Sequence, residues 1–127
     1  MNTAVVGLGS NIKPQENIKR AKELLAKKHS VVSESDFRKT KPIGRINQDD
    51  FINGVLLIET PLKLNQFKQS LKRIEKTLGR KRTLNKFGAR TIDLDVLVWN
   101  ERIVHKDFNE REFVRTAVLK ILPRLSA

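Results

Sequence analysis

The sequence contains no cysteine among its 127 residues. This absence excludes a disulfide framework and a thiolate metal site, and it suits a reducing compartment. No apolar run is long enough to span a bilayer, and no basic stretch precedes the short apolar run at the N-terminus. We therefore expect a cytoplasmic protein with no membrane segment.

Acidic residues are few. The chain has 14 Asp and Glu against 26 Lys and Arg, which gives a formal net charge of +12. Such an excess predicts a polyanionic partner. Total charge does not distinguish a nucleotide triphosphate from a nucleic acid or from a solvated basic surface, because all three favour Lys and Arg. The spacing of particular residues has to decide.

Length and composition predict one domain spanning residues 1–127. The chain is long enough for a single core and too short for two ordinary domains. Hydrophobic residues make up 39% and charged residues 31%, a balance typical of folded chains.

Hydrophobic periodicity predicts alternating strands and helices. The apolar and β-branched runs indicate strands over 4–8, 31–39, 51–60 and 91–99, and apolar stripes at helical spacing indicate helices over 14–28, 64–78 and 110–122. Gly79 and Pro123 are expected to end the last two helices. This order predicts an α+β fold with a ferredoxin-like, mainly antiparallel sheet and helices on both faces.

Two carboxylates interrupt the last predicted strand. Asp93 and Asp95 are two residues apart, so both point to one face while Ile92, Leu94, Val96 and Val98 face the core. Like charges so placed repel unless a cation lies between them, and Mg²⁺ prefers oxygen ligands of this kind. For so short a motif the alternative is a solvent-facing pair bound to Arg or Lys.

A basic loop precedes that strand. Five cations fall within residues 80–90, namely Arg80, Lys81, Arg82, Lys86 and Arg90, together with the aromatic Phe87. Cations beside a carboxylate pair are typical of phosphoryl transfer, in which carboxylates hold metal and arginines bind phosphate oxygens. Taken alone, the loop slightly favours a nucleic-acid patch, with Phe87 as a stacking ring, but a phosphate backbone would be repelled by the neighbouring carboxylate pair.

Two further groups complete the candidate site. Phe51 and Asn53 share one face of their predicted strand, and a ring beside an amide can bind and recognise the edge of a flat heterocycle. A core Phe and a strand-end Asn are the plain alternative. His105, Arg111 and Phe113 follow near the C-terminus, although an isolated histidine is more often a surface or core residue.

These segments together resemble the 6-hydroxymethyl-7,8-dihydropterin pyrophosphokinase family. The resemblance runs from GLGSN (7–11) through TKPIGRINQDDFIN (40–53) and LGRKRTLNKFGARTIDLDVLV (78–98) to HKDFNEREFV (105–114). It implies a three-layer α/β/α fold and the transfer of pyrophosphate from MgATP to the hydroxyl of 6-hydroxymethyl-7,8-dihydropterin, with release of AMP. It also implies ATP and the pterin as partners, with neither membrane nor nucleic acid, and we expect a monomer.

The resemblance assigns roles residue by residue. It makes Asp93 and Asp95 the ligands of two Mg²⁺ ions and, with Arg80 and Arg90, the catalytic residues. It implies ATP contacts by Lys72, Glu75, Arg80, Arg82, Arg90, His105 and Arg111 and pterin contacts by Thr40, Ile43, Phe51, Asn53 and Phe113. Phe87 belongs to a loop that closes over the site.

The sequence departs from the family pattern in places. The segment between Trp99 and His105 is several residues shorter than in typical relatives, Val104 replaces the usual proline, and Phe87 replaces a common tryptophan. These departures leave open a shortened, non-catalytic relative, and the net charge of +12 leaves open a small basic nucleic-acid-binding domain.

Overall fold

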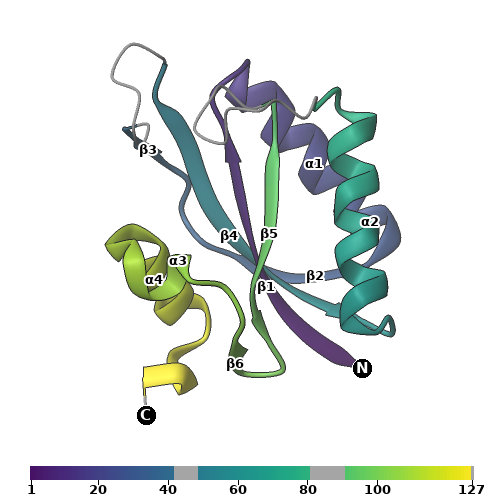
Figure 1. Ribbon diagram of the computed structural model, residues 1–127, viewed down its shortest axis with the longest axis vertical. Helices are drawn as coiled ribbons and strands as arrows, with labels where there is room; N and C mark the ends of the chain where they lie inside the picture. The colour runs from purple at the N-terminus through teal and green to yellow at the C-terminus, as the bar shows by residue number, and fades with distance from the viewer. Residues whose placement is uncertain (42–48, 81–90, 127) are drawn as a thin grey trace.

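The computed structural model describes residues 1–41, 49–80 and 91–126. Its elements follow the chain in the order shown in Figure 1. They are β1 (Asn2–Ser10), α1 (Pro14–Lys28), β2 (Ser30–Glu34), β3 (Arg38–Thr40), β4 (Phe51–Thr60), α2 (Leu64–Thr77), β5 (Asp93–Trp99), β6 (Arg102–Ile103), α3 (Asp107–Glu110), α4 (Glu112–Ile121) and a 3₁₀ turn (Pro123–Ser126).

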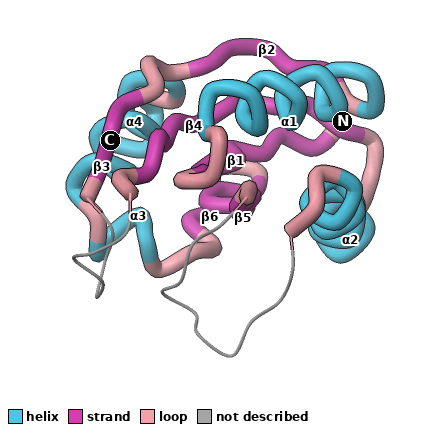
Figure 2. The backbone as a smooth tube through the Cα atoms, turned by 90° about the horizontal axis from the view of Figure 1, so that it is seen from above, coloured by secondary structure: helices cyan, strands magenta, loops and turns pink. Residues whose placement is uncertain are grey.

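The strands form one six-stranded sheet in the order β2-β4-β1-β5-β6, and β3 also pairs with β4. Every pairing is antiparallel. Helices α1 and α2 lie on one side of the sheet, and α3 and α4 lie on the other (Figures 1 and 2). The predicted α+β class, with an antiparallel ferredoxin-like sheet and helices on both faces, is confirmed.

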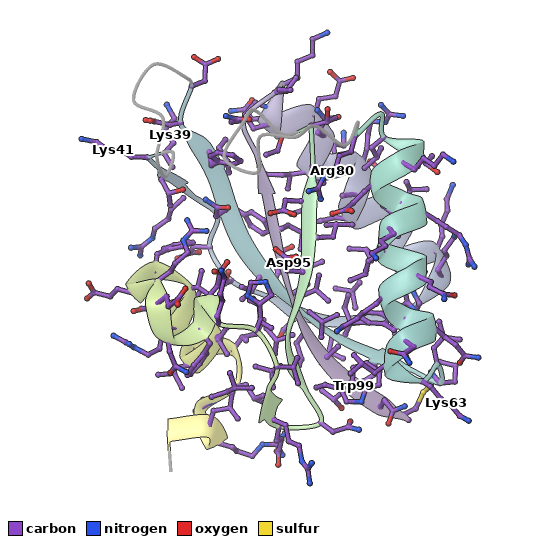
Figure 3. The ribbon with its side chains drawn as sticks, in the orientation of Figure 1. Lys39, Lys41, Lys63, Arg80, Asp95 and Trp99 are labelled. Carbon is purple, nitrogen blue, oxygen red and sulfur yellow. The ribbon has the colours of Figure 1, made fainter. Side chains whose placement is uncertain are left out.

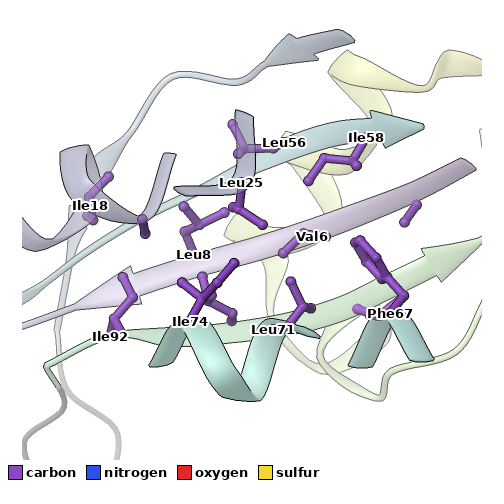
Figure 4. Close-up of a cluster of buried hydrophobic side chains, with 14 of the residues drawn as sticks. Val6, Leu8, Ile18, Leu25, Leu56, Ile58, Phe67, Leu71, Ile74 and Ile92 are labelled. Carbon is purple, nitrogen blue, oxygen red and sulfur yellow. The ribbon is translucent and has the colours of Figure 1, made fainter. Parts of the chain in front are cut away.

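Two hydrophobic clusters hold the layers together. Val6 and Leu8 of β1 point toward α1 and α2, where they pack with Ile18, Leu25 and Phe67 (Figure 4). The neighbouring Val5 points the other way and packs with Val118 of α4. Because strand side chains alternate, β1 is buried on both faces and forms the centre of the molecule.

The predicted strand 31–39 is wrong as a single element. The structure has β2 and β3 instead, with an irregular register between Val31 and Ser33. After β2 the backbone N–H of Val55 donates to the Ser35 hydroxyl at 2.9 Å, so a side chain replaces the carbonyl that would continue the ladder. The chain then turns and seats the Phe37 ring against Gly54 of β4.

The predicted orientation of Val98 is also wrong. Val6 pairs with Val96 while Val5 pairs with Val98, so Leu97 is an extra residue in β5 opposite β1. A bulge of this kind reverses the alternation. Val98 therefore lies with Leu97 in the cluster on the α4 side, whereas Ile92, Leu94 and Val96 face α1 and α2 as predicted.

The predicted C-terminal helix 110–122 is present as α4 (Glu112–Ile121), and the short helix α3, which was not predicted, precedes it. Arg111 takes an extended conformation (φ −122°, ψ 110°) and separates α3 from α4. Within the described ranges, no helix combines the length and the apolar content that a bilayer crossing requires.

Candidate active site

A hollow opens on the α4 side of the sheet, over the end of β1 that leads into α1. It has a volume of about 370 Å³ including space open to solvent, and three strands and two helical segments line it. Its walls include Asn53 of β4, Asp93 and Asp95 of β5, Asp107 of α3, and Arg111 and Phe113.

Two glycines of β1 form its floor. Gly9 pairs with Asn53 on one side and Asp93 on the other, and Gly7 pairs with Val55 and Asp95. A β-carbon at Gly9 would collide with Oδ1 of Asn53. The missing side chains therefore leave room over the centre of the sheet, with an amide on one side and carboxylates on the other.

The residues after Gly9 hold the neighbouring segments in place. The Ser10 hydroxyl donates to the carbonyl of Thr91 at 2.6 Å, just before β5 begins. The Asn11 amide donates to the carbonyl of Asp49 at 3.1 Å, just before β4. Both side chains are buried, so the GLGSN segment fixes the two strands that carry the polar groups of the hollow.

Asn53 and Thr40 lie together on the amide side. The Asn53 amide nitrogen donates to the Thr40 hydroxyl. This bond orients the Asn53 side chain beside the hollow. In the pairing of β3 with β4, Thr40 lies opposite Phe51. Phe113 contributes to the lining, while Phe51 is half-buried on β4 outside the set of lining residues.

Asp93 and Asp95 are both half-buried and line the same hollow. The pKa of Asp95 is raised to about 7, first by burial and then by the negative charges of Asp93, Glu75 and Asp107, against the lowering effect of Arg80. Such a carboxylate is ionised at neutral pH only in part, unless a cation compensates its charge. Figure 3 shows Asp95 on β5, with Arg80 near the end of α2.

Asp107 is a third carboxylate of the hollow, and the sequence interpretation missed it. Ligand atoms of Asp95, His105 and Asp107 lie within 4.8 Å of one another. Its position two residues after His105 is the signal that could have identified it, because a histidine and an acid so spaced can reach one centre.

The His105 ring has a defined hydrogen-bonding role. The backbone N–H of Asp107 donates to Nδ1 at 3.0 Å, so Nδ1 carries the lone pair and a neutral ring carries its proton on Nε2. Nε2 lies 3.9 Å from Oδ1 of Asp95. A protonated nitrogen cannot ligate a metal, so the metal ligands that this cluster offers are carboxylate oxygens, which fit Mg²⁺. The Nε2–H group of His105 remains a hydrogen-bond donor beside them.

Cations face these carboxylates from two directions. Nη1 of Arg80 lies 2.5 Å from Oε2 of Glu75 and 2.9 Å from Oδ1 of Asp93. On the other wall, Nη1 of Arg111 lies 3.9 Å from Oδ2 of Asp107. The structure therefore brings together the predicted residues Glu75, Arg80, Asp93, Asp95, His105 and Arg111.

The remaining predicted residues are placed as follows. Lys72 is exposed on α2 and does not line the hollow. Four candidates lie outside the described residues, namely Ile43, Arg82, Phe87 and Arg90.

A carboxylate cluster that suits a divalent cation, flanked by arginines and next to an amide and a ring, is typical of the class of enzymes that act on phosphates. Comparison with known proteins specifies the class. Residues 5–123 match the family described as 7,8-dihydro-6-hydroxymethylpterin-pyrophosphokinase. The chain belongs to this family.

Individual relatives agree with this. The chain is 38% identical over 132 residues to a 2-amino-4-hydroxy-6-hydroxymethyldihydropteridine pyrophosphokinase of Haemophilus influenzae, covering 95% of this chain and 82% of that protein. It is 32% identical to the Bacillus subtilis protein of the same name, covering 94% and 78%. It is 30% identical to the bifunctional protein FolKE of Lactococcus lactis, covering 96% of this chain and 38% of that longer protein.

Proposed function

We propose that the chain transfers pyrophosphate from MgATP to the hydroxyl of 6-hydroxymethyl-7,8-dihydropterin, releasing AMP, in folate biosynthesis. The observation that carries the proposal is the row Asn53–Gly9–Asp93 across three paired strands. In this row the Asn53 amide can recognise a heterocycle. It lies across Gly9 from the Asp93 carboxylate, which can hold a phosphate-bound cation. Family membership supports the same reaction.

The phosphate side of the reaction falls to the carboxylates and arginines. Asp93 and Asp95 would hold Mg²⁺, as two ions that accompany ATP, and the metal would supply positive charge that compensates the phosphates. Arg80, Arg82 and Arg90 bind phosphate oxygens, which suits the forked guanidinium group. Residues that border the nucleotide are Lys72, Glu75, His105 and Arg111.

The pterin side falls to the amide and the rings. Asn53, oriented by Thr40, reads the edge of the heterocycle, since an amide both donates and accepts. Phe51 and Phe113 hold its faces, and the resemblance assigns pterin contact to Ile43 and loop closure to Phe87. The pterin hydroxyl then attacks the β-phosphorus of ATP, and AMP leaves. Positioning and charge neutralisation account for catalysis without a covalent nucleophile.

The protein is proposed to work in the cytoplasm, as a monomer and as one domain over residues 1–127. The absence of cysteine and of a bilayer-length apolar run supports the compartment. A sedimentation measurement at working concentration tests the monomer.

The decisive test is AMP release from MgATP with and without the hydroxymethyl pterin. AMP should appear only when both substrates are present, and Asp95→Ala should abolish it. Asp36→Ala is the matched control, because Asp36 is an exposed aspartate outside the hollow and should leave the rate unchanged.

Two results would contradict the proposal. If ATP binds but no AMP appears, the chain is the non-catalytic relative. If Asp95→Ala releases AMP as fast as the parent, the carboxylates have no part in the reaction.

A further inference from the structure

One arginine nitrogen lies between two carboxylates at the edge of the hollow. Nη1 of Arg80 is 2.5 Å from Oε2 of Glu75 and 2.9 Å from Oδ1 of Asp93. The three side chains are only 12 to 29% exposed, so these charges are screened weakly by solvent. Asp93 is one of the two carboxylates that the proposed function assigns to a divalent cation.

The end of helix α2 fixes Arg80 in this position. Gly79 takes a left-handed conformation (φ 93°), the N–H of Gly79 donates to the carbonyl of Lys76, and the N–H of Arg80 donates to the carbonyl of Glu75, each at 3.0 Å. This is the Schellman arrangement that ends many helices. It turns the chain back over its last turn and brings the Arg80 side chain to the Glu75 carboxylate.

Glu75 itself is held by the sheet. Its Oε2 accepts the backbone N–H of Leu94 at 2.7 Å, between the two aspartates of β5. Glu75 is therefore fixed from two sides and does not depend on Asp93 for its position. Arg80 keeps one carboxylate partner even when the other is taken away.

We propose that Arg80 is a counter-ion of Asp93 before substrate binds, that a divalent cation must displace it from that carboxylate, and that Glu75 is the positioning residue that retains it. This inference rests on the proposed function for the identity of the cation site. Within the described residues both ion pairs use Nη1, so the other N–H groups of the guanidinium fork are available to phosphate oxygens.

This exchange of ion-pair partners favours joint entry of the metal and the nucleotide. A cation arriving alone has to break the ion pair between Arg80 and Asp93, and the guanidinium then loses a partner. A cation arriving with ATP supplies phosphate oxygens for Arg80 at the same time, so each charge exchanges one partner for another. The free cation should therefore bind weakly, and Arg80 should be one cause of that weakness.

A purely structural ion pair between α2 and β5 is the competing explanation. It does not need Arg80, because Leu71, Ile74 and Leu78 are already buried with Leu94 and Val96 in one cluster. A structural role predicts lower stability and equal or weaker cation binding after substitution. The counter-ion role predicts tighter cation binding.

The experiment is a titration of Mn²⁺, followed by electron paramagnetic resonance, with no nucleotide or pterin present. Arg80→Gln should lower the dissociation constant for Mn²⁺ about fivefold, the effect of removing one partly buried ion pair. The matched control is Arg73→Gln, an exposed arginine of the same helix with no ion-pair partner among the described residues. Its effect should be less than about twofold. Unchanged or weaker binding by Arg80→Gln overturns the proposal.

Glu75 is tested by a double-mutant cycle. Glu75→Gln should weaken Mn²⁺ binding, because Arg80 then has only Asp93 to pair with. In the Arg80→Gln background the same change should lose at least half of its effect. A full, additive effect would show that Glu75 does not act through Arg80.

A measurement on the unsubstituted protein covers the case in which a variant fails to fold. The side-chain Nε–H resonance of Arg80 should shift as Mg²⁺ saturates the site, and a resonance that stays fixed overturns the displacement. None of these experiments contains pterin or ATP, so their failure would leave AMP release untouched. Conversely, a protein that binds Mn²⁺ as expected but releases no AMP would refute the proposed function alone.

Discussion

At the scale of single residues, Gly9 is the most restrictive position in the floor of the hollow. A β-carbon there would collide with Oδ1 of Asn53. Gly9→Ala should therefore displace the amide and raise KM for the pterin about tenfold or more, which corresponds to roughly 1.4 kcal/mol. Steady-state kinetics at saturating MgATP measures this effect.

Gly7→Ala is the control for that substitution. A β-carbon at Gly7 would lie 3.1 Å from Cδ1 of Leu97, the far end of a flexible side chain that can shift. Its effect on KM for the pterin should be smaller than that of Gly9→Ala. Equal effects at both glycines would mean that the Asn53 amide is not the group that matters.

The same residues show what local sequence could and could not predict at this scale. Asp93 and Asp95 were found because alternation along one strand places them on one face. The roles of Gly7, Gly9 and Asp107 depend on which residues lie opposite across strands and on where α3 begins. Register between distant segments is set by the packed fold, so no spacing within one segment reveals it.

At the scale of elements, the end of α2 links helix termination to the site. Gly79 has a positive φ of 93° with no atom within 4 Å of an added β-carbon, so the penalty of substitution is purely conformational. Gly79→Ala should lower the free energy of unfolding by about 1 kcal/mol and should also slow AMP release by displacing Arg80. Urea denaturation and the AMP assay measure the two effects.

Gly79→Asn tests whether the backbone conformation of residue 79, and not the loss of glycine itself, causes these effects. Asparagine tolerates the left-handed region better than alanine, so this variant should lose less stability and less activity. If the two variants lose equal activity, the backbone conformation does not position Arg80.

The turn between β5 and β6 contains a correctable strain. Trp99 pairs with Arg102, so Asn100 and Glu101 form a two-residue turn with positive φ values of 48° and 68°. Both central residues of a type I′ turn need positive φ, and glycine suits the second. Glu101→Gly should raise the free energy of unfolding by about 0.5–1 kcal/mol, measured by thermal denaturation.

The substitution also removes an ion pair between Glu101 and Arg124 at 2.8 Å. Both side chains are at least half exposed, so this pair should contribute little. Arg124→Gln removes the same pair without changing the turn and should leave stability nearly unchanged. A large loss in Arg124→Gln would mean that the exposed pair, and not the turn, governs stability here.

Elements with strong local patterns were predicted well. The predicted helix 14–28 and strand 51–60 coincide with α1 and β4, because a full apolar stripe or a long β-branched run determines each. β6 and α3 have two and four residues, too few for a periodic signal. The break between β2 and β3 depends on a hydroxyl that pairs with a distant strand, which local pattern cannot reveal.

At the scale of the whole molecule, the two sides of the sheet respond to pH in opposite ways. On the α2 side the buried His29 ring contacts the hydroxyls of Thr60 and Ser70, each at 3.2 Å. Burial first, and then the charge of Lys28, lowers the pKa of His29 below its ordinary 6.5. As the pH falls below this value, the unfolded chain takes up a proton before the folded one does, so the contribution of His29 to stability is lost.

On the α4 side Asp95 has the opposite sign. Its pKa is raised from 3.8 to about 7, so between these values the folded state holds more protons than the unfolded state. Stability therefore falls as the pH rises through this window, and the loss is complete above it. Burial also raises the pKa of Glu75, which contributes in the same direction.

The effects of His29 and Asp95 on the slope of stability against pH should partly cancel in the parent protein. Single variants should separate the two effects. With divalent cations chelated, His29→Gln should lose stability steadily from about pH 4.5 to about pH 7, whereas Asp95→Asn should gain stability as the pH rises toward 6.5. Urea denaturation at a series of pH values measures both.

Added Mg²⁺ should stabilise the parent most at about pH 8, because Asp95 is ionised there and its negative charge can bind the cation. The same addition should have little effect on Asp95→Asn. The slope, and not the absolute stability, is the quantity to compare, because either substitution also changes packing. If His29→Gln and the parent have the same slope, the buried histidine is not the titrating group on the α2 side. If Mg²⁺ stabilises Asp95→Asn as much as the parent, the cation binds elsewhere and the hollow loses its assigned ligand.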